Sequence, residues 1–154
     1  MAAGGDYEIS EATVDEVRPL RGRYLRPDQP DEAVVYQTDD DESARHFVAR
    51  DADGAIIAVA SLSFADRVAG IPPFGHPGMR MRGLAVDDSY RGQGVGAAMV
   101  AHMLEYGKAA GIAEGWATAP VKNLPFFRKN KFREMSSEFE VAGLGPHRVV
   151  AKNL

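Results

Sequence analysis

The sequence predicts an α/β fold in which helices pack on one mixed β-sheet. The 154 residues suffice for a single domain with a buried core. Apolar runs typical of strands alternate with segments of helical periodicity. A glycine-rich turn at residues 91–96 joins a strand to the longest of the helical segments. The predicted order is a strand, a helix, three strands, a helix, a strand, a short helix and two strands.

The first predicted elements are a short strand and an amphipathic helix. Residues 7–10 form the strand, and Ser10 is expected to cap the helix that follows, with Thr13 as a second candidate. Because proline breaks a helix interior, this helix should end before Pro27. Residues 26–41 are polar, acidic and contain prolines, so we expect them to form a loop.

A β-hairpin and a further strand come next. The turn signal Asp-Ala-Asp-Gly at residues 51–54 separates two apolar runs, residues 46–50 and 55–64, which should pair with each other. Residues 66–78 hold three prolines and three glycines and are predicted to form a loop. Residues 79–86 are predicted to form the strand that leads into the glycine-rich turn.

The C-terminal half begins with the helix that follows this turn. Val95, Met99 and Met103 lie on one apolar face, and Gly107 and Gly111 bracket the expected end of the helix. The remaining predicted elements are a strand at residues 114–118, a short helix at 121–130 and strands at 132–141 and 147–152.

Composition argues against several classes of function. A formal net charge of -4 disfavours nucleic acid as a partner. The absence of cysteine excludes disulfides and a cysteine nucleophile, and the four histidines lack the spacing of a metal site, so we expect no metal. No apolar run reaches the ~20 residues of a membrane helix, so we expect a cytoplasmic protein without a membrane partner. We expect residues 1–6 to be a disordered leader and residues 7–154 to be the domain.

The turn Arg91-Gly92-Gln93-Gly94-Val95-Gly96 has the chemistry of an anion site. Its glycines let the backbone approach a ligand, the first helical N–H groups have no partner within the helix, and Arg91 adds a positive charge. The alternative is a tight connection that binds no ligand. A Walker A loop is excluded because Gly96 is followed by Ala97, and glycines spaced by two do not make a dinucleotide-binding fingerprint.

Two motifs together resemble those of the GNAT acetyltransferase superfamily. Its acyl-CoA signature, Gln/Arg-x-x-Gly-x-Gly/Ala, reads Arg91-x-x-Gly94-x-Gly96 here. Its second signature, Phe-Tyr-x-Lys-x-Gly-Phe, resembles residues 126–132, which read Phe-Phe-Arg-Lys-Asn-Lys-Phe. The resemblance implies a single-domain GNAT fold, with a mixed, mostly antiparallel sheet, a splayed central strand pair and helices on both faces. It also implies acetyl-CoA as co-substrate.

The resemblance implies that acetyl-CoA binds along both motifs. The strand before the turn would present a main-chain N–H group to the reacting carbonyl, and the turn would hold the pyrophosphate. Phe127 stands where the family usually has the tyrosine that protonates the leaving thiolate, so this chain lacks the acid at that catalytic position. The implied cofactor-binding residues are Leu84, Ala85, Val86, Arg91, Gly92, Gln93, Gly94, Val95, Gly96, Ala97, Asn123, Phe126 and Phe127.

The likeness extends to one branch of the family, the glyphosate N-acetyltransferase-like proteins. The segment Leu-Arg-Pro-x-Gln-Pro at residues 25–30 and the sequence Gly-Pro-His that ends at His147 match that branch. This implies that His147 is the catalytic base and that Arg26 and Arg82 hold an anionic group of a small, amino-acid-like amine. Pro120 stands where the branch tends to have a further arginine, so one anion-binding residue is missing.

The sequence leaves other functions open. A non-catalytic acyl-CoA-binding or sensing domain is favoured by Phe127 and disfavoured by His147. The acidic run at residues 39–42 could attract a cationic amine, although such runs more often form solvated loops. A protein substrate is a third alternative. The expected partner is a small-molecule amine, and the expected assembly is a monomer or homodimer.

Overall fold

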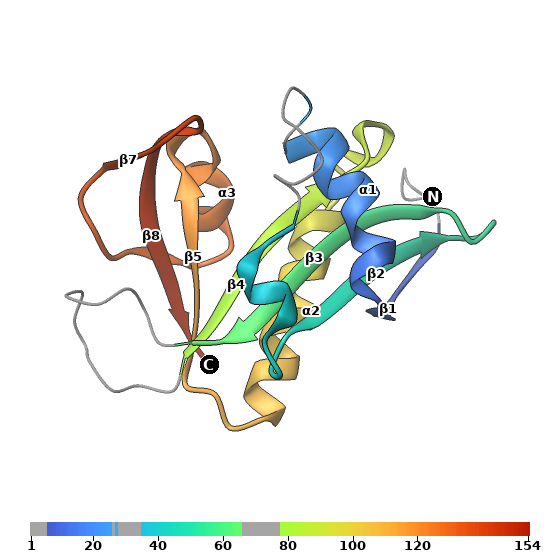
Figure 1. The fold of residues 1–154 in the computed structure, drawn as a ribbon, viewed down its shortest axis with the longest axis horizontal. Coiled ribbons are helices and arrows are strands. Elements are labelled where there is room, and N and C mark those ends of the chain that lie inside the picture. The colour runs from blue at the N-terminus through green and yellow to red at the C-terminus, as the bar shows by residue number, and fades with distance from the viewer. Residues whose placement is uncertain (1–5, 26, 28–34, 66–77) are drawn as a thin grey trace. The chain divides into compact units, whose positions relative to one another are not determined.

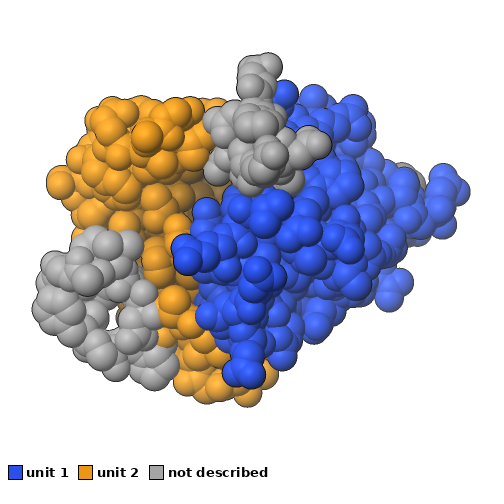
Figure 2. Space-filling view, viewed as in Figure 1, with its two compact units in different colours: residues 1–63, 81–103 blue, residues 64–80, 104–154 orange. Residues whose placement is uncertain are grey.

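The structure, a computed structural model, describes residues 6–25, 27, 35–65 and 78–154 (Figure 1). The predicted leader apart from Asp6, the predicted loop at 66–78 apart from Gly78, and Arg26 lie outside the described residues. The chain divides into two units (Figure 2). Unit 1 comprises residues 1–63 and 81–103, and unit 2 comprises residues 64–80 and 104–154.

Unit 1 contains the predicted first strand, the first helix and the β-hairpin. Its elements are β1 (Tyr7–Ala12), α1 (Val14–Leu25), the 3₁₀ helix η2 (Gln37–Asp40), β2 (Arg45–Asp51), most of β3 (Ile56–Phe64), the later part of β4 (Gly78–Val86), η3 (Asp88–Tyr90) and the first part of α2 (Val95–Ala109). β2 pairs antiparallel with both β1 and β3, which confirms the hairpin. α1 ends before Pro27 as predicted, and η2 interrupts the segment predicted as a loop.

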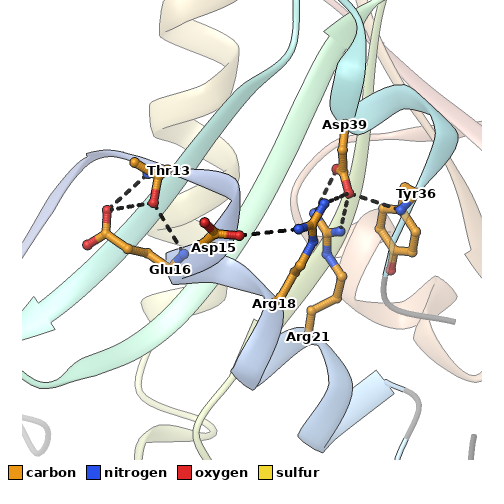
Figure 3. A network of polar contacts seen from close by, with 7 residues as sticks. All are labelled: Thr13, Asp15, Glu16, Arg18, Arg21, Tyr36 and Asp39. Atoms are coloured by element: carbon orange, nitrogen blue, oxygen red, sulfur yellow. Dashed lines mark hydrogen bonds and ion pairs between the residues drawn. The ribbon is translucent and has the colours of Figure 1, made fainter. Parts of the chain in front are cut away.

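The N-terminus of α1 is capped by Thr13 and not by Ser10. β1 extends to Ala12, and Ser10 pairs with Val48 inside the sheet, so the prediction for Ser10 is wrong. Thr13 Oγ1 accepts a hydrogen bond from Glu16 N at 3.3 Å, and Glu16 Oε1 accepts one from Thr13 N at 3.0 Å (Figure 3). This reciprocal pair satisfies two amides at the start of the helix.

The helices of unit 1 pack on opposite faces of its sheet. Val17 of α1 packs with Val48, Val59 and other buried residues in one cluster. Phe47 precedes Val48 on β2, so its ring lies on the other face. There it meets the ring of His102 on α2, with 5.2 Å between ring centroids. The expected placement of helices on both faces is confirmed. Within the described ranges, no helix is long and apolar enough to cross a membrane.

Unit 2 contains the C-terminal strands. Its further elements are β5 (Glu114–Pro120), η4 (Val121–Asn123), α3 (Leu124–Lys129), β6 (Arg133–Glu134), β7 (Phe139–Val141) and β8 (Gly145–Asn153). β8 pairs antiparallel with β5, β6 and β7. β4 and β5 pair in parallel over three residues, Gly78–Arg80 with Glu114–Trp116. Both strands continue beyond these residues without further pairing to each other. These pairings confirm a mixed, mostly antiparallel sheet with a splayed strand pair.

The strand predicted at residues 132–141 is wrong, because it is divided into β6 and β7. Between them, Ser136 Oγ accepts a hydrogen bond from Val149 N at 2.9 Å and donates one to Ser137 O at 2.9 Å. A side-chain oxygen therefore takes the place of a backbone acceptor in the ladder, and regular pairing stops there. β8 also begins two residues earlier than predicted, at Gly145.

A buried ion pair joins α1 to the segment that follows it (Figure 3). Arg21 has no exposed surface. Its guanidinium donates to both oxygens of the Asp39 carboxylate, at 2.8 and 3.2 Å, and to Ser61 Oγ at 2.8 Å. Burial alone would raise the pKa of Asp39, but the hydrogen bonds from Arg21 and Tyr36 N bring it below its usual value. Ser61 Oγ also lies 2.7 Å from Nδ1 of His46, whose pKa is lowered, mainly by burial.

The end of α2 shows why glycine is needed after this helix. Ile112 N donates to Gly107 O at 2.9 Å, and Gly111 N donates to Lys108 O at 3.1 Å. This pair of hydrogen bonds is the Schellman motif, which requires a left-handed residue just beyond the helix. Gly111 occupies that position with a φ of 84°, in agreement with the predicted helix end.

Helix α3 ends in the same motif, but a lysine occupies the left-handed position. Phe132 N donates to Phe127 O at 2.9 Å, and Lys131 N donates to Arg128 O at 3.0 Å. Lys131 has a φ of 71° and stands where the second GNAT signature has glycine. The rings of Phe127 and Phe132 meet edge to face at 5.2 Å, which is the apolar contact that commonly accompanies this motif.

Removing Asp39 should destabilise the protein strongly. Asp39→Ala leaves a buried guanidinium without its carboxylate, so we expect the free energy of unfolding in urea titrations to fall by about 3–5 kcal/mol. Because the folded pKa of Asp39 lies below the unfolded value, the stabilisation should be full at neutral pH and lost as pH falls below about 4. Asp15→Ala, which removes an exposed partner of Arg18, is the control and should change little. Similar small effects from both variants would contradict the account.

Replacing Lys131 with glycine should stabilise the protein. The left-handed conformation costs a residue with a Cβ about 1–2 kcal/mol, and the greater freedom of glycine in the unfolded chain offsets part of that gain. We expect Lys131→Gly to raise the free energy of unfolding by about 0.5–1 kcal/mol. Gly111→Lys makes the opposite substitution at the end of α2 and should lower the free energy of unfolding. A Lys131→Gly variant no more stable than the wild type would show that the position is unstrained.

Candidate active site

The turn between β4 and α2 is held in shape by side-chain hydrogen bonds. Asp87 Oδ1 accepts one from Ser89 Oγ at 2.7 Å and one from Ser89 N at 3.0 Å, and these bonds lower the pKa of Asp87. Gln93 Nε2 donates to Ser89 O at 3.0 Å and so ties the turn back on itself. Arg91 is exposed, and its Nε lies 2.8 Å from Asp88 Oδ1. The predicted cationic side chain is therefore at the surface of the turn.

Two glycines of the turn adopt a left-handed backbone. Gly92 has a φ of 75° and Gly94 a φ of 83°. A Cβ placed on either residue would meet no other atom within 4 Å. Glycine is therefore required here by the backbone conformation, and not by crowding from the rest of the protein. The space beside both residues is open to a ligand.

The first turn of α2 presents backbone N–H groups without helical partners. The first helical hydrogen bond runs from Ala98 N to Gly94 O at 3.0 Å. The N–H groups of Val95, Gly96 and Ala97 therefore have no acceptor within the helix. Val95 is buried and anchors the turn, whereas Gly96 and Ala97 are half-buried. Together with the positive end of a 15-residue helix, these donors can bind a phosphate group.

The predicted residues of β4 lie on both faces of the strand. Ala85 is buried in the core of unit 1, and Leu84 and Val86 point to the opposite face, where they are half-buried. Arg82 precedes them, and its guanidinium carbon lies 3.9 Å from the centre of the Tyr36 ring. Arg26, the other predicted anion-binding arginine, lies outside the described residues.

The predicted base, His147, lies on β8 in unit 2. It pairs with Pro120 of β5 and Phe139 of β7, and the residue is only 4% exposed. Its Nδ1 is 2.8 Å from Gly145 O. Because a carbonyl oxygen can only accept a hydrogen bond, Nδ1 carries the hydrogen and Nε2 of the neutral ring carries the lone pair. Nε2 is therefore the atom of His147 that can accept a proton.

The second predicted motif forms an aromatic cluster in unit 2. The ring of Phe127 meets those of Phe126 and Phe132 edge to face, with 5.2 Å between centroids in both pairs. Phe132 is buried, while Phe126 and Phe127 are half-buried. Asn123, just before α3, is exposed. The cluster offers an apolar surface, and Phe127 supplies no proton donor.

The acidic run at residues 39–42 is mostly exposed, as expected, and Asp39 is the exception. Asp39 is buried against Arg21, with its side chain 2% exposed. Asp41 is exposed but accepts hydrogen bonds from Ser43 N at 2.8 Å and Ser43 Oγ at 2.6 Å, which lower its pKa. These carboxylates therefore serve local structure. Across the described part of the chain, no group of three or more His, Asp or Glu side chains could hold a metal.

One residue near the predicted site was missed. Tyr36 is 6% exposed, and its ring lies against the guanidinium groups of Arg21 and Arg82. Tyr36 belongs to no motif that the sequence analysis identified. The one hint in the sequence is its position three residues before Asp39, whose carboxylate accepts a hydrogen bond from Tyr36 N at 2.9 Å. Unit 1 thus holds the turn, the β4 residues and this arginine stack, and unit 2 holds His147 and the aromatic cluster.

Comparisons with known proteins show which family the chain resembles. The sequence model of the acetyltransferase (GNAT) family matches residues 14–132. The uncharacterized N-acetyltransferase YitI of Bacillus subtilis (strain 168) is 28% identical over 153 residues, which cover 96% of each chain. The fold is similar to that of an IAA acetyltransferase from Bacillus cereus ATCC 14579, with a TM-score of 0.70 and 19% identity over 97% of this chain and 100% of the other. It is also similar to AAC(6')-Iy solved with the bisubstrate analog CoA-S-monomethyl-acetylneamine, with a TM-score of 0.71 and 24% identity over 86% of this chain and 95% of the other.

The matched residues make up more than half of the chain. They include β4, the turn, α2 and the aromatic cluster. The expected fold class and co-substrate are therefore those of the family. The chain belongs to the acetyltransferase (GNAT) family and is an acetyl-CoA-dependent N-acetyltransferase.

Proposed function

We propose that this enzyme acetylates the amine of a small molecule that carries a carboxylate or phosphate group, by direct attack of the amine on the thioester. The observation that carries the proposal is the hydrogen bond from Nδ1 of His147 to Gly145 O at 2.8 Å. This bond leaves Nε2 as the basic nitrogen, which is what removal of a proton from the attacking amine requires. A sensing domain that only binds acyl-CoA would have no use for such a group.

In this proposal, backbone groups of unit 1 bind the co-substrate. The amides of Val95, Gly96 and Ala97 receive the pyrophosphate, and Arg91 adds a charge-assisted contact. A main-chain N–H group of Leu84–Val86 stabilises the oxyanion that develops on the acetyl carbonyl. In unit 2, Asn123 and the rings of Phe126 and Phe127 contact the pantetheine. These roles are the ones that the family signatures imply for the turn and the aromatic cluster.

The proton transfers of the reaction can be assigned atom by atom. The amine nitrogen bonds to the carbonyl carbon, the carbon–sulfur bond breaks, and the amine proton passes to Nε2 of His147. The thiolate leaves with the bonding electron pair and takes a proton from water, because Phe127 has none to give. A thiol with a pKa near ~8.5 is a tolerable leaving group as its anion, so the loss of the family tyrosine does not stop the reaction.

Two observations favour an anionic acceptor over a cationic one: the presence of Arg82, and the local contacts that engage carboxylates of the acidic run. Arg82 and Arg26 match arginines that hold an anionic group in the glyphosate N-acetyltransferase-like branch. A cationic acceptor such as a polyamine would need carboxylates available for binding. Asp39 is instead committed to Arg21, and Asp41 to Ser43. Two of the four carboxylates of the run are thus engaged in local contacts, which weighs against the cationic alternative.

Gly94→Asp should abolish binding of CoA. The new side chain and its negative charge would occupy the open space beside the first amides of α2, so we expect the affinity measured by titration calorimetry to fall at least about 100-fold. Gly54→Asp is a matched control, because Gly54 has a φ of 84° and equally open surroundings, but lies in the hairpin turn. The control should bind CoA normally. A folded Gly94→Asp variant with unchanged CoA affinity would remove the turn from the cofactor site.

His147→Ala should lower kcat/KM by about 10²–10⁴ without weakening CoA binding. The variant should also lose the rise of kcat/KM with pH that a general base produces, as followed by thiol release over a pH series. His102→Ala, which changes an exposed histidine on α2, is the control and should keep the wild-type profile. A folded His147→Ala variant with full activity and an unaltered pH profile would show that another group takes the proton.

A further inference from the structure

The ring of Tyr36 contacts two arginines. The guanidinium carbons of Arg21 and Arg82 each lie 3.9 Å from its centroid. Both contacts are well within the range of cation–π attraction. All three residues belong to unit 1 and come from three segments, α1, the chain before η2, and β4.

One side of this stack is immobile. Arg21 is completely buried, and its guanidinium is held by both oxygens of Asp39 and by Ser61 Oγ. Asp39 also accepts the hydrogen bond from Tyr36 N, so the same carboxylate holds the backbone of Tyr36. The ring is therefore anchored through its main chain and through its contact with Arg21, and it forms a platform for Arg82.

Gly83 brings β4 against this platform. It has a φ of 70°, a conformation that glycine adopts without strain. A Cβ at this position would lie 3.1 Å from Tyr36 Cε2 and 3.1 Å from Arg21 Nε. A larger residue would thus press on the two groups that form the platform. Gly83, the residue after Arg82, therefore allows β4 to lie close to the ring of Tyr36 and the side chain of Arg21.

We propose that Tyr36 is a positioning residue for the acceptor: it holds the guanidinium plane of Arg82 in the orientation that binds the anionic group of the amine. The proposal rests on the proposed function, in which Arg82 binds that group. An arginine side chain has many rotamers, and a planar platform removes much of that freedom before the substrate arrives. Tyr36 acts through Arg82 and touches no reacting atom. It therefore sets the preference for anionic over neutral amines and leaves the chemical step unchanged.

The test uses amines in matched pairs, glycine against glycinamide and phosphoethanolamine against ethanolamine, with acetyl transfer followed by CoA release. In Tyr36→Leu, the KM for the anionic member should rise about 3- to 30-fold, the range that loss of one cation–π contact gives. The KM for acetyl-CoA and the kcat should stay near wild type. Tyr36→Phe retains the ring and should keep the wild-type KM for the anionic amine. If Tyr36→Leu does not fold, Arg82→Lys serves in its place, because it keeps the charge and loses the planar stack.

A double-mutant comparison separates this proposal from the proposed function. If Tyr36 acts through Arg82, then Tyr36→Leu should add no further loss to Arg82→Ala. If Arg82→Ala raises the KM for the anionic amines but neither Tyr36→Leu nor Arg82→Lys does, the positioning role is refuted and the anionic acceptor stands. Equal use of both members of each pair by the wild type, with no effect of Arg82→Ala, would refute the anionic acceptor and the positioning role with it.

Discussion

A fully buried guanidinium must be given hydrogen-bond partners, and in unit 1 this requirement joins segments that are far apart in the sequence. Arg21 reaches Asp39 and Ser61, which lie 18 and 40 residues further along the chain. The three bonds hold α1, η2 and β3 together, and Asp39 in turn holds the backbone of Tyr36. Leaving any of these groups without its partner would cost more than an exposed ion pair contributes. The ring of Tyr36, and the arginine that rests on it, owe their position to this pair.

We propose that acetyl-CoA and the acceptor amine are recognised by different kinds of groups. The co-substrate is held mainly by main-chain amides at the start of α2, which keep their charge distribution at every pH and survive most side-chain substitutions. The acceptor is held by an arginine whose orientation depends on Tyr36, Arg21 and Gly83. Substitutions in this second group can change the acceptor while CoA binding is retained.

The elements that local sequence determines were predicted well, and the errors arose where tertiary partners decide. The Asp-Ala-Asp-Gly turn marked the hairpin, and the spacing of Gly92 and Gly94 marked the turn before α2, because both depend on backbone conformation. α1 also ends before Pro27, although it holds Pro19 in its interior. Ser10 was the first candidate cap and Thr13 the second, but pairing with β2 places Ser10 inside a strand. The burial of Asp39 depends on Arg21, and the division of the last predicted strand depends on a bond between Ser136 and Val149 across the sheet. Tyr36 matches no motif, and its importance comes from the two arginines that contact its ring. The roles assigned to His147 and the other site residues stay predictions.

The first amides of α2 are proposed to bind the pyrophosphate of acetyl-CoA, and amide hydrogen exchange measures these groups directly. Without ligand, the N–H groups of Val95, Gly96 and Ala97 lack helical acceptors and should exchange quickly. With saturating CoA, their exchange should slow markedly, while amides in the hairpin turn at Gly54 keep their rates. If calorimetry shows that CoA binds and these three amides exchange as fast as before, the cofactor is held elsewhere and the account of the site is wrong.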